Sequence, residues 1–201
     1  MALSHTGMTT EEFSDIVDQW IQTARHPEVE SPIPKWCTSL CQELLDYLRD
    51  NDFITYIVSG GRLNSCAYLL KKVYGIPPEQ TIGSSVKTRF EVREDGPVLV
   101  RLPEIEHVDD GEGKPVGINR FIGKQPILAF GNSDGDLEML QWTAAGDGLR
   151  LIGIVHHTDS DREWAYDRGA PFGGLDEALD EATDRDWLLV DMANDWSTVY
   201  K

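Results

Sequence analysis

A short stretch rich in acids and glycine, Phe130 to Asp136, constrains this chain more than any other. It reads Phe-Gly-Asn-Ser-Asp-Gly-Asp, follows an apolar run at 127–130 and precedes a helical pattern from Leu137. A strand, a sharp glycine turn with carboxylates and then a helix is a common way to build a divalent-cation site, because hard cations need oxygen ligands converging from a rigid turn. The candidate ligands are Asn132, Asp134 and Asp136.

The same turn has a second interpretation. Asp and Asn are good N-cap residues, and negative charge is favourable at the start of a helix. Capping of the following helix is therefore the alternative to metal binding.

A second polar stretch, Ser59-Gly60-Gly61, follows the apolar run 53–58. Read as the end of a strand before a helix, it offers a hydroxyl and accessible backbone N–H groups, which suit an anion such as phosphate. The alternative is a plain strand-to-helix turn. The sequence around Ser59 matches neither the G-x-G-x-x-G fingerprint of dinucleotide binding nor the G-x-S-x-G nucleophile elbow.

A lysine is expected at the start of a helix over 114–122, between Gly113 and Pro115. A cation at this end opposes the helix dipole, so Lys114 breaks a local rule. Such a violation points to a functional demand, here binding a phosphate and offsetting clustered carboxylates. The alternative is a solvated surface lysine.

Four polar residues gather after the predicted strand 150–155: His156, His157, Asp159 and Asp161. Histidines beside acids are able to bind a metal ion. Adjacent strand residues point to opposite faces, however, so the two histidines do not easily share one ion. A loop facing a substrate, or plain surface, is the other interpretation.

Composition limits the partners. The chain has 201 residues, 18 basic and 35 acidic side chains and a net charge of -17, and such a charge repels nucleic acid and anionic membranes. No apolar run approaches the roughly 18–20 residues that span a bilayer, and residues 1–10 lack a signal peptide pattern. We expect a cytoplasmic chain, with an exported longer parent left open. Cys37 and Cys41 lack a second pair to complete a zinc site, so ordinary core cysteines are expected.

Apolar periodicity predicts alternating helices and strands. A capping box, Thr9 with Glu12, begins the first helix. The alternation predicts an α/β sandwich with a mainly parallel sheet, whose ligands bind at the carboxyl ends of strands. The expected helices cover about 9–24, 36–50, 63–74, 114–122, 136–142, 161–167 and 175–184. The expected strands cover 53–58, 126–130, 150–155 and 187–190, with a hairpin of 86–92 and 97–102.

Taken together, Ser59 in Val-Ser-Gly-Gly, Lys114 in Gly-Lys-Pro-Val-Gly-Ile and the turn Gly-Asn-Ser-Asp-Gly-Asp resemble the haloacid dehalogenase superfamily, nearest to its phosphoserine-phosphatase-like branch. The resemblance covers about 36–191. It implies a Rossmann-like three-layer sandwich over 35–201 that lacks its first strand, and the remnant of a helical cap with its linker over 1–34.

The resemblance also implies roles. In that family an aspartate attacks phosphorus, a second aspartate two residues on protonates the leaving oxygen, and Mg²⁺ neutralises charge. Ser59, Gly60 and Lys114 would hold the phosphoryl group of a small phosphorylated substrate. Asn132 takes the place of a metal-ligand aspartate, so Asp136 and Asp134 would supply the charge.

The family's first motif, Asp-x-Asp-x-Thr after an apolar strand, does not occur in this sequence. We therefore expect an N-terminally truncated member without its nucleophile. Losing that central strand leaves buried backbone groups unpaired, at about 1–3 kcal/mol each, so we expect either marginal stability or direct pairing of 53–58 with 126–130.

Three functions compete on the sequence alone. The first is a Mg²⁺-dependent phosphomonoester hydrolase whose activity resides in a longer parent. The second is a non-catalytic module, derived from a phosphatase, that binds phosphate, metal or a protein. The third is an unrelated nucleotide-binding α/β domain, which no phosphate fingerprint supports. The oligomeric state and the substrate cannot be read from the sequence.

Overall fold

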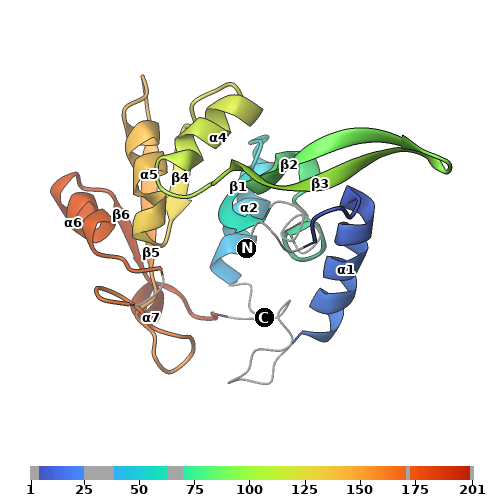
Figure 1. Ribbon diagram of the computed structural model, residues 1–201. Coiled ribbons are helices and arrows are strands. Elements are labelled where there is room, and N and C mark those ends of the chain that lie inside the picture. The colour runs from blue at the N-terminus through green and yellow to red at the C-terminus, as the bar shows by residue number, and fades with distance from the viewer. Residues whose placement is uncertain (1–4, 25–38, 63–69, 171–172, 200–201) are drawn as a thin grey trace. The chain divides into compact units, whose positions relative to one another are not determined.

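The computed structural model describes residues 5–24, 39–62, 70–170 and 173–199. The chain divides into two compact units between Asp109 and Asp110. Figure 1 shows the elements of each unit along the chain. The domain boundary expected near residue 34 lies outside the described residues and stays a prediction.

The first unit contains a mixed three-stranded sheet of order β1-β2-β3. Strand β1 runs parallel to β2, and β2 and β3 form a long antiparallel hairpin (Figure 1). The hairpin was predicted, but both of its strands extend further than expected. The elements are α1 (Thr10–Thr23), α2 (Ser39–Asp50), β1 (Ile57–Arg62), η2 (Pro78–Gln80), β2 (Thr81–Arg93) and β3 (Gly96–His107).

Helix α1 begins as its sequence predicts. The Thr9 hydroxyl accepts a hydrogen bond from the backbone N–H of Glu12 at 3.0 Å, and the Glu12 carboxylate accepts one from the backbone N–H of Thr9 at 2.8 Å. The large apolar side chains of Ile16 and Trp20 are exposed. The residues that α1 does bury are Phe13, Val17 and Ile21.

The predicted helix that stops at Gly75 is confirmed in its described part. Residues 70–74 are helical, and Gly75 has a φ of +67°, a left-handed conformation that favours glycine. Arg49 of α2 donates to the carbonyl of Tyr74 at 2.7 Å, so a side chain satisfies one of the carbonyls that a helix end leaves open.

The second unit contains a wholly parallel sheet of order β4-β5-β6. Helix α5 follows β4 and α6 precedes β6, so helices alternate with strands as the sequence predicts (Figure 1). The core includes Ile118, Leu140 and Ile154, each at most 1% exposed. The elements are α4 (Gly113–Phe121), β4 (Leu128–Gly131), η3 (Asp134–Asp136), α5 (Leu137–Ala144), β5 (Leu151–His156), α6 (Glu177–Asp184), β6 (Leu188–Asp191) and α7 (Met192–Asp195).

The structure confirms a mixed α/β fold and corrects several details. The described strands form two three-stranded sheets rather than one. Strand β1 pairs with β2 and β4 with β5, so the expected pairing of 53–58 with 126–130 is not found among the described strands. The helix expected at 161–167 is also wrong, because that segment consists of turns and irregular chain. None of the described helices is both long and apolar enough to cross a membrane.

Candidate functional site

The acidic turn lies at the carboxyl end of β4, and Asp136 closes it. The Asp136 Oδ2 atom accepts hydrogen bonds from the backbone N–H groups of Asn132 at 2.9 Å and Ser133 at 3.2 Å, and from the Ser133 hydroxyl at 3.3 Å. Gly131 is required at the strand end, because a Cβ atom there would lie 2.5 Å from the Asp136 Cβ. The turn is therefore held by its own last carboxylate.

The second oxygen of Asp136 forms an ion pair with Lys114 from the first turn of α4. The Lys114 Nζ lies 3.0 Å from Asp136 Oδ1. Lys114 is 4% exposed and Asp136 is 7% exposed, so the interpretation of Lys114 as a solvated surface lysine is wrong. Buried charges need a partner, and this pair offsets the unfavourable position of a cation at a helix start.

Asp134 caps a helix, although not the one that follows it. Its Oδ1 atom accepts from the backbone N–H of Asp176 at 3.0 Å and of Ala178 at 2.9 Å, at the start of α6. Its Oδ2 atom accepts from the Asp176 N–H at 3.1 Å, and its own N–H donates to the Gly174 carbonyl at 2.8 Å. Asp134 is therefore a helix cap, but of α6, whereas the capping interpretation expected the helix that follows the turn.

Asn132 is exposed at the mouth of the turn. Its side-chain Nδ2 donates to the Tyr166 hydroxyl at 2.7 Å, and that hydroxyl lies 3.3 Å from the Asn132 backbone carbonyl. The amide nitrogen is thus engaged, and the amide oxygen Oδ1 has no partner among the described residues. This amide oxygen is therefore available as a ligand for a cation.

The oxygen atoms of this turn suit only one kind of metal binding. No group of three or more His, Cys, Asp or Glu side chains within the described ranges could hold an ion by itself. One free amide oxygen and the remaining lone-pair site of the Asp134 carboxylate are few ligands, but Mg²⁺ is usually held by one or two carboxylates and completes its shell with water and substrate phosphate. The residues therefore fit Mg²⁺ that arrives with a phosphoryl group, and do not fit a self-sufficient metal centre.

The Ser59-Gly60 stretch belongs to the first unit and lies inside a strand. Ser59 pairs with Gly83 across β1 and β2, and β1 continues to Arg62, so the expected strand end before Ser59 is wrong. The Ser59 hydroxyl accepts a hydrogen bond from the Gly61 N–H at 3.2 Å. Within one unit the structure brings together Lys114, Asn132, Asp134 and Asp136, while Ser59 and Gly60 lie in the other.

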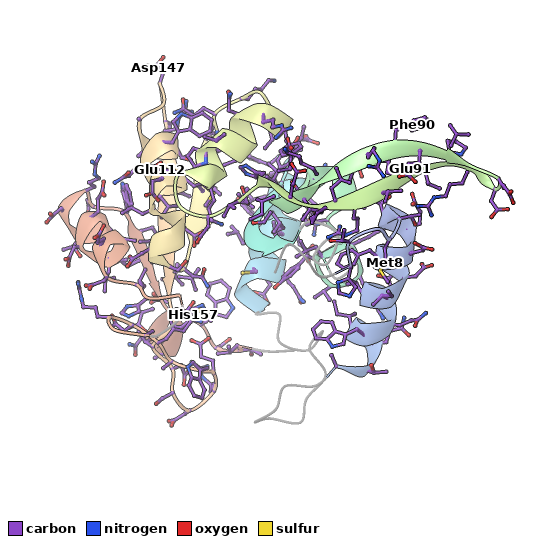
Figure 2. The ribbon with its side chains drawn as sticks, in the orientation of Figure 1. Met8, Phe90, Glu91, Glu112, Asp147 and His157 are labelled. Carbon is purple, nitrogen blue, oxygen red and sulfur yellow. The ribbon has the colours of Figure 1, made fainter. Side chains whose placement is uncertain are left out.

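His156, the last residue of β5, and His157, the residue after it, contact different partners, in keeping with the expectation that the two histidines do not share one ion. The His156 Nε2 lies 2.9 Å from Asp167, and the His157 Nδ1 lies 2.6 Å from Glu163. The backbone N–H of Arg168 and, more weakly, the His156 ring hold the pKa of Asp167 below its usual range. His157, labelled in Figure 2, also stacks on Tyr166 with ring centroids 4.8 Å apart.

Glu163 and Tyr166 are functional candidates that sequence reasoning missed. They lie in the segment 161–167, for which a helix was expected, and an irregular loop carries no periodicity that reveals its contacts. The nearest signal is their position shortly after a strand that ends in two histidines.

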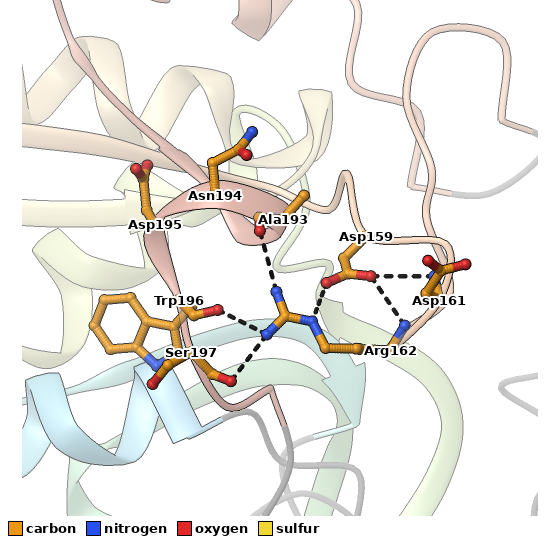
Figure 3. A pocket seen from close by; sticks show the side chains of 8 residues that line it. All are labelled: Asp159, Asp161, Arg162, Ala193, Asn194, Asp195, Trp196 and Ser197. Atoms are coloured by element: carbon orange, nitrogen blue, oxygen red, sulfur yellow. Dashed lines mark hydrogen bonds and ion pairs between the residues drawn. The ribbon is translucent and has the colours of Figure 1, made fainter.

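A separate polar cavity of about 650 Å³ lies where the segments after β5 and β6 meet (Figure 3). Arg162 fills its centre: one nitrogen donates to the carbonyls of Trp196 and Ser197, each at 2.9 Å, and others bond Asp159 and the carbonyl of Ala193. Burial raises the pKa of Asp159, but the hydrogen bonds from Arg162 outweigh it and leave that pKa lowered. The Arg162 guanidinium is thus engaged in holding the chain after β6. The other charged side chains that line the cavity are acidic.

No protein-family model matches this chain. A comparison with curated proteins likewise gives no match.

Proposed function

We propose that this chain carries the phosphoryl-binding and cation-binding part of a haloacid dehalogenase-type phosphatase site, on a Rossmann-like α/β core. The observation that carries the proposal is the buried ion pair of Lys114 and Asp136 beside the carboxyl end of β4, 3.0 Å between charged atoms. The ligand class is a small phosphorylated molecule bound together with Mg²⁺.

The location of the ion pair supports phosphate binding. Ligands of parallel sheets bind beyond the carboxyl ends of the strands, and the turn after β4 occupies such an end. The Lys114 ammonium group lies at this turn, 3.0 Å from Asp136 Oδ1, and supplies positive charge there. A phosphate that approaches α4 meets both this ammonium group and the positive end of the helix dipole.

Each residue of the turn has a separate task in this proposal. Asp136 fixes the turn and holds Lys114 in place, while Asn132 offers its amide oxygen to the cation. Asp134 anchors the start of α6 and adds negative charge nearby. When bound, Mg²⁺ would neutralise the charge of the phosphoryl group.

We expect this chain to bind phosphate without hydrolysing phosphomonoesters. Its sequence contains no Asp-x-Asp-x-Thr, and the carboxylates of the turn are engaged by Lys114 and by backbone N–H groups. The same observations favour the second candidate, a non-catalytic binding module descended from a phosphatase. A segment with a nucleophilic aspartate would have to supply the missing chemistry.

The test is calorimetric titration with inorganic phosphate at saturating Mg²⁺. The wild type should bind, and the double variant Lys114→Met with Asp136→Asn should bind at least about tenfold more weakly, because the phosphate loses a charge-assisted donor. The double change removes both buried charges together, and the introduced amide keeps an oxygen for the turn, so no unpaired buried charge is created. Lys124→Ala, at an exposed lysine of the same unit, is the matched control.

Turnover is measured in parallel with p-nitrophenyl phosphate. We expect no release above that of the double variant. Equal phosphate affinity in the wild type and the double variant would refute the proposed site, and wild-type turnover would show that the chain contains a nucleophile.

A further inference from the structure

We propose that Tyr166 is a positioning residue that turns the Asn132 side-chain amide so that its oxygen, rather than its nitrogen, is presented to a cation. This inference rests on the proposed function, since it concerns the cation of the same site. It adds Tyr166, from the loop after β5, to the site at the turn after β4.

The direction of two hydrogen bonds carries the inference. An amide side chain has a donor end and an acceptor end, and a hydroxyl has one proton to donate. The Tyr166 hydroxyl donates its proton to the Asn132 backbone carbonyl at 3.3 Å. It can then only accept from the side chain, so it selects the Nδ2 end at 2.7 Å and leaves Oδ1 facing away.

Tyr166 is itself held firmly from the β5 side. Its ring stacks on the His157 ring with an interplanar angle of 23°, and its backbone N–H donates to the His157 carbonyl at 3.0 Å. His157 is in turn held through Nδ1 by Glu163, whose side chain is 1% exposed. A continuous chain of contacts therefore runs from Glu163 through His157 and Tyr166 to Asn132.

The orientation matters because the two ends of an amide behave oppositely toward a metal ion. The oxygen is a ligand for hard cations, whereas the NH₂ group presents protons to them. A neutral amide in place of a carboxylate is thus useful only when something fixes its orientation. An aspartate at the same position would need no such help, because both of its terminal atoms are oxygens.

The test is a double-mutant cycle on Mg²⁺ affinity, with Mg²⁺ titrated calorimetrically into protein that holds inorganic phosphate. Tyr166→Phe keeps the ring and its stacking but removes the hydroxyl. In the Asn132 background this change should weaken Mg²⁺ binding about tenfold, as loss of a group that orients a metal ligand typically does. In the Asn132→Asp background it should weaken binding less than about twofold, because no orientation is left to lose.

A second readout does not involve the metal. The Asn132 side-chain NH₂ resonances should shift in Tyr166→Phe and should not shift in Tyr47→Phe, a change at a tyrosine of the other unit that is 66% exposed. Urea unfolding of each variant shows whether the fold is retained.

Three outcomes would overturn the inference: an equal loss of Mg²⁺ affinity in both backgrounds, which means that Tyr166 only supports the loop; no loss in either; or no Mg²⁺ binding by any variant. If any of these occurs while phosphate affinity still depends on Lys114, the positioning role fails and the proposed phosphoryl site stands. Loss of the Lys114 dependence would instead refute the proposed function.

Discussion

Two stretches of this chain look alike in sequence and differ in structure. Ser59-Gly60-Gly61 and Gly131-Asn132-Ser133 both follow apolar runs and both combine glycine with a small polar residue. The second stretch ends its strand at once and becomes a turn. The first stays in β1 as far as Arg62, with an irregular register after Ser59.

The difference lies in what accepts the backbone N–H groups. Beyond Gly131, the carboxylate of Asp136 accepts the N–H groups of Asn132 and Ser133, so those residues can leave the sheet without losing hydrogen bonds. Beyond Ser59, the side-chain acceptor found among the described residues is the Ser59 hydroxyl, which accepts the Gly61 N–H at 3.2 Å, and β1 continues to pair with β2. In these two stretches, the strand ends where a side chain takes over from the neighbouring strand as the acceptor of backbone N–H groups. The presence of glycine alone does not end the strand.

The largest effect is expected from removing the Asp136 carboxylate, which takes the place of a neighbouring strand as the acceptor of backbone N–H groups. Asp136→Ala removes the acceptor of two backbone N–H groups and leaves Lys114 buried without its ion-pair partner. Breaking a buried pair in this way costs about 3–5 kcal/mol. Urea unfolding followed by tryptophan fluorescence measures the loss, and Asp147→Ala, at an exposed aspartate of the same unit, is the control. A loss no larger than that of the control would mean that Asp136 does not close the turn.

The next prediction compares the loss of stability caused by alanine at two glycines of the same turn. A Cβ atom at Gly131 would lie 2.5 Å from the Asp136 Cβ, next to the backbone, whereas one at Gly135 would meet the Asp110 Oδ1 at 2.4 Å. The Asp110 carboxylate is the end of an exposed side chain and can move aside. We expect Gly131→Ala to cost about 1–3 kcal/mol and Gly135→Ala to cost less than about 1 kcal/mol. Equal losses in urea unfolding would contradict the requirement for close packing at Gly131.

Much of the local structure follows from the sequence because short-range chemistry determines it. The capping box of Thr9 and Glu12, the helix stop at Gly75 and the alternating strands of the second unit were all predicted and are found. The proximity of Lys114 to the turn was expected from resemblance, and its burial follows from the pairing with Asp136.

What the sequence did not reveal depends on long-range contacts. The helix that Asp134 caps lies about forty residues further on, since its carboxylate accepts from Asp176 and Ala178. The bond between Tyr166 and Asn132 likewise joins loops that follow two different strands. Neither contact leaves a periodic pattern, and an acid near a helix start is satisfied equally well by its own helix or by another.

The smallest effect tests which hydroxyl stabilises the irregular end of β1. Within the described ranges the Ser59 hydroxyl accepts the Gly61 N–H, two residues away, so Ser59→Ala should change stability by less than about 0.5 kcal/mol. Ser84 of β2 donates to the Gly60 carbonyl at 2.9 Å and accepts from the Asp109 N–H at 3.0 Å. Because Asp109 is fully buried, Ser84→Ala should cost about 1–3 kcal/mol, through the lost bonds and a backbone group left unpaired.

Urea unfolding of the two serine variants gives the comparison directly, since both lose the same hydroxyl from neighbouring strands. A larger loss for Ser59→Ala than for Ser84→Ala would place the anchor of this segment in its own sequence, as in the turn after β4. The expected order would place it in the neighbouring strand β2. A strand that passes through two glycines would then be held by its partner strand, whereas the acidic turn is held by its own carboxylate.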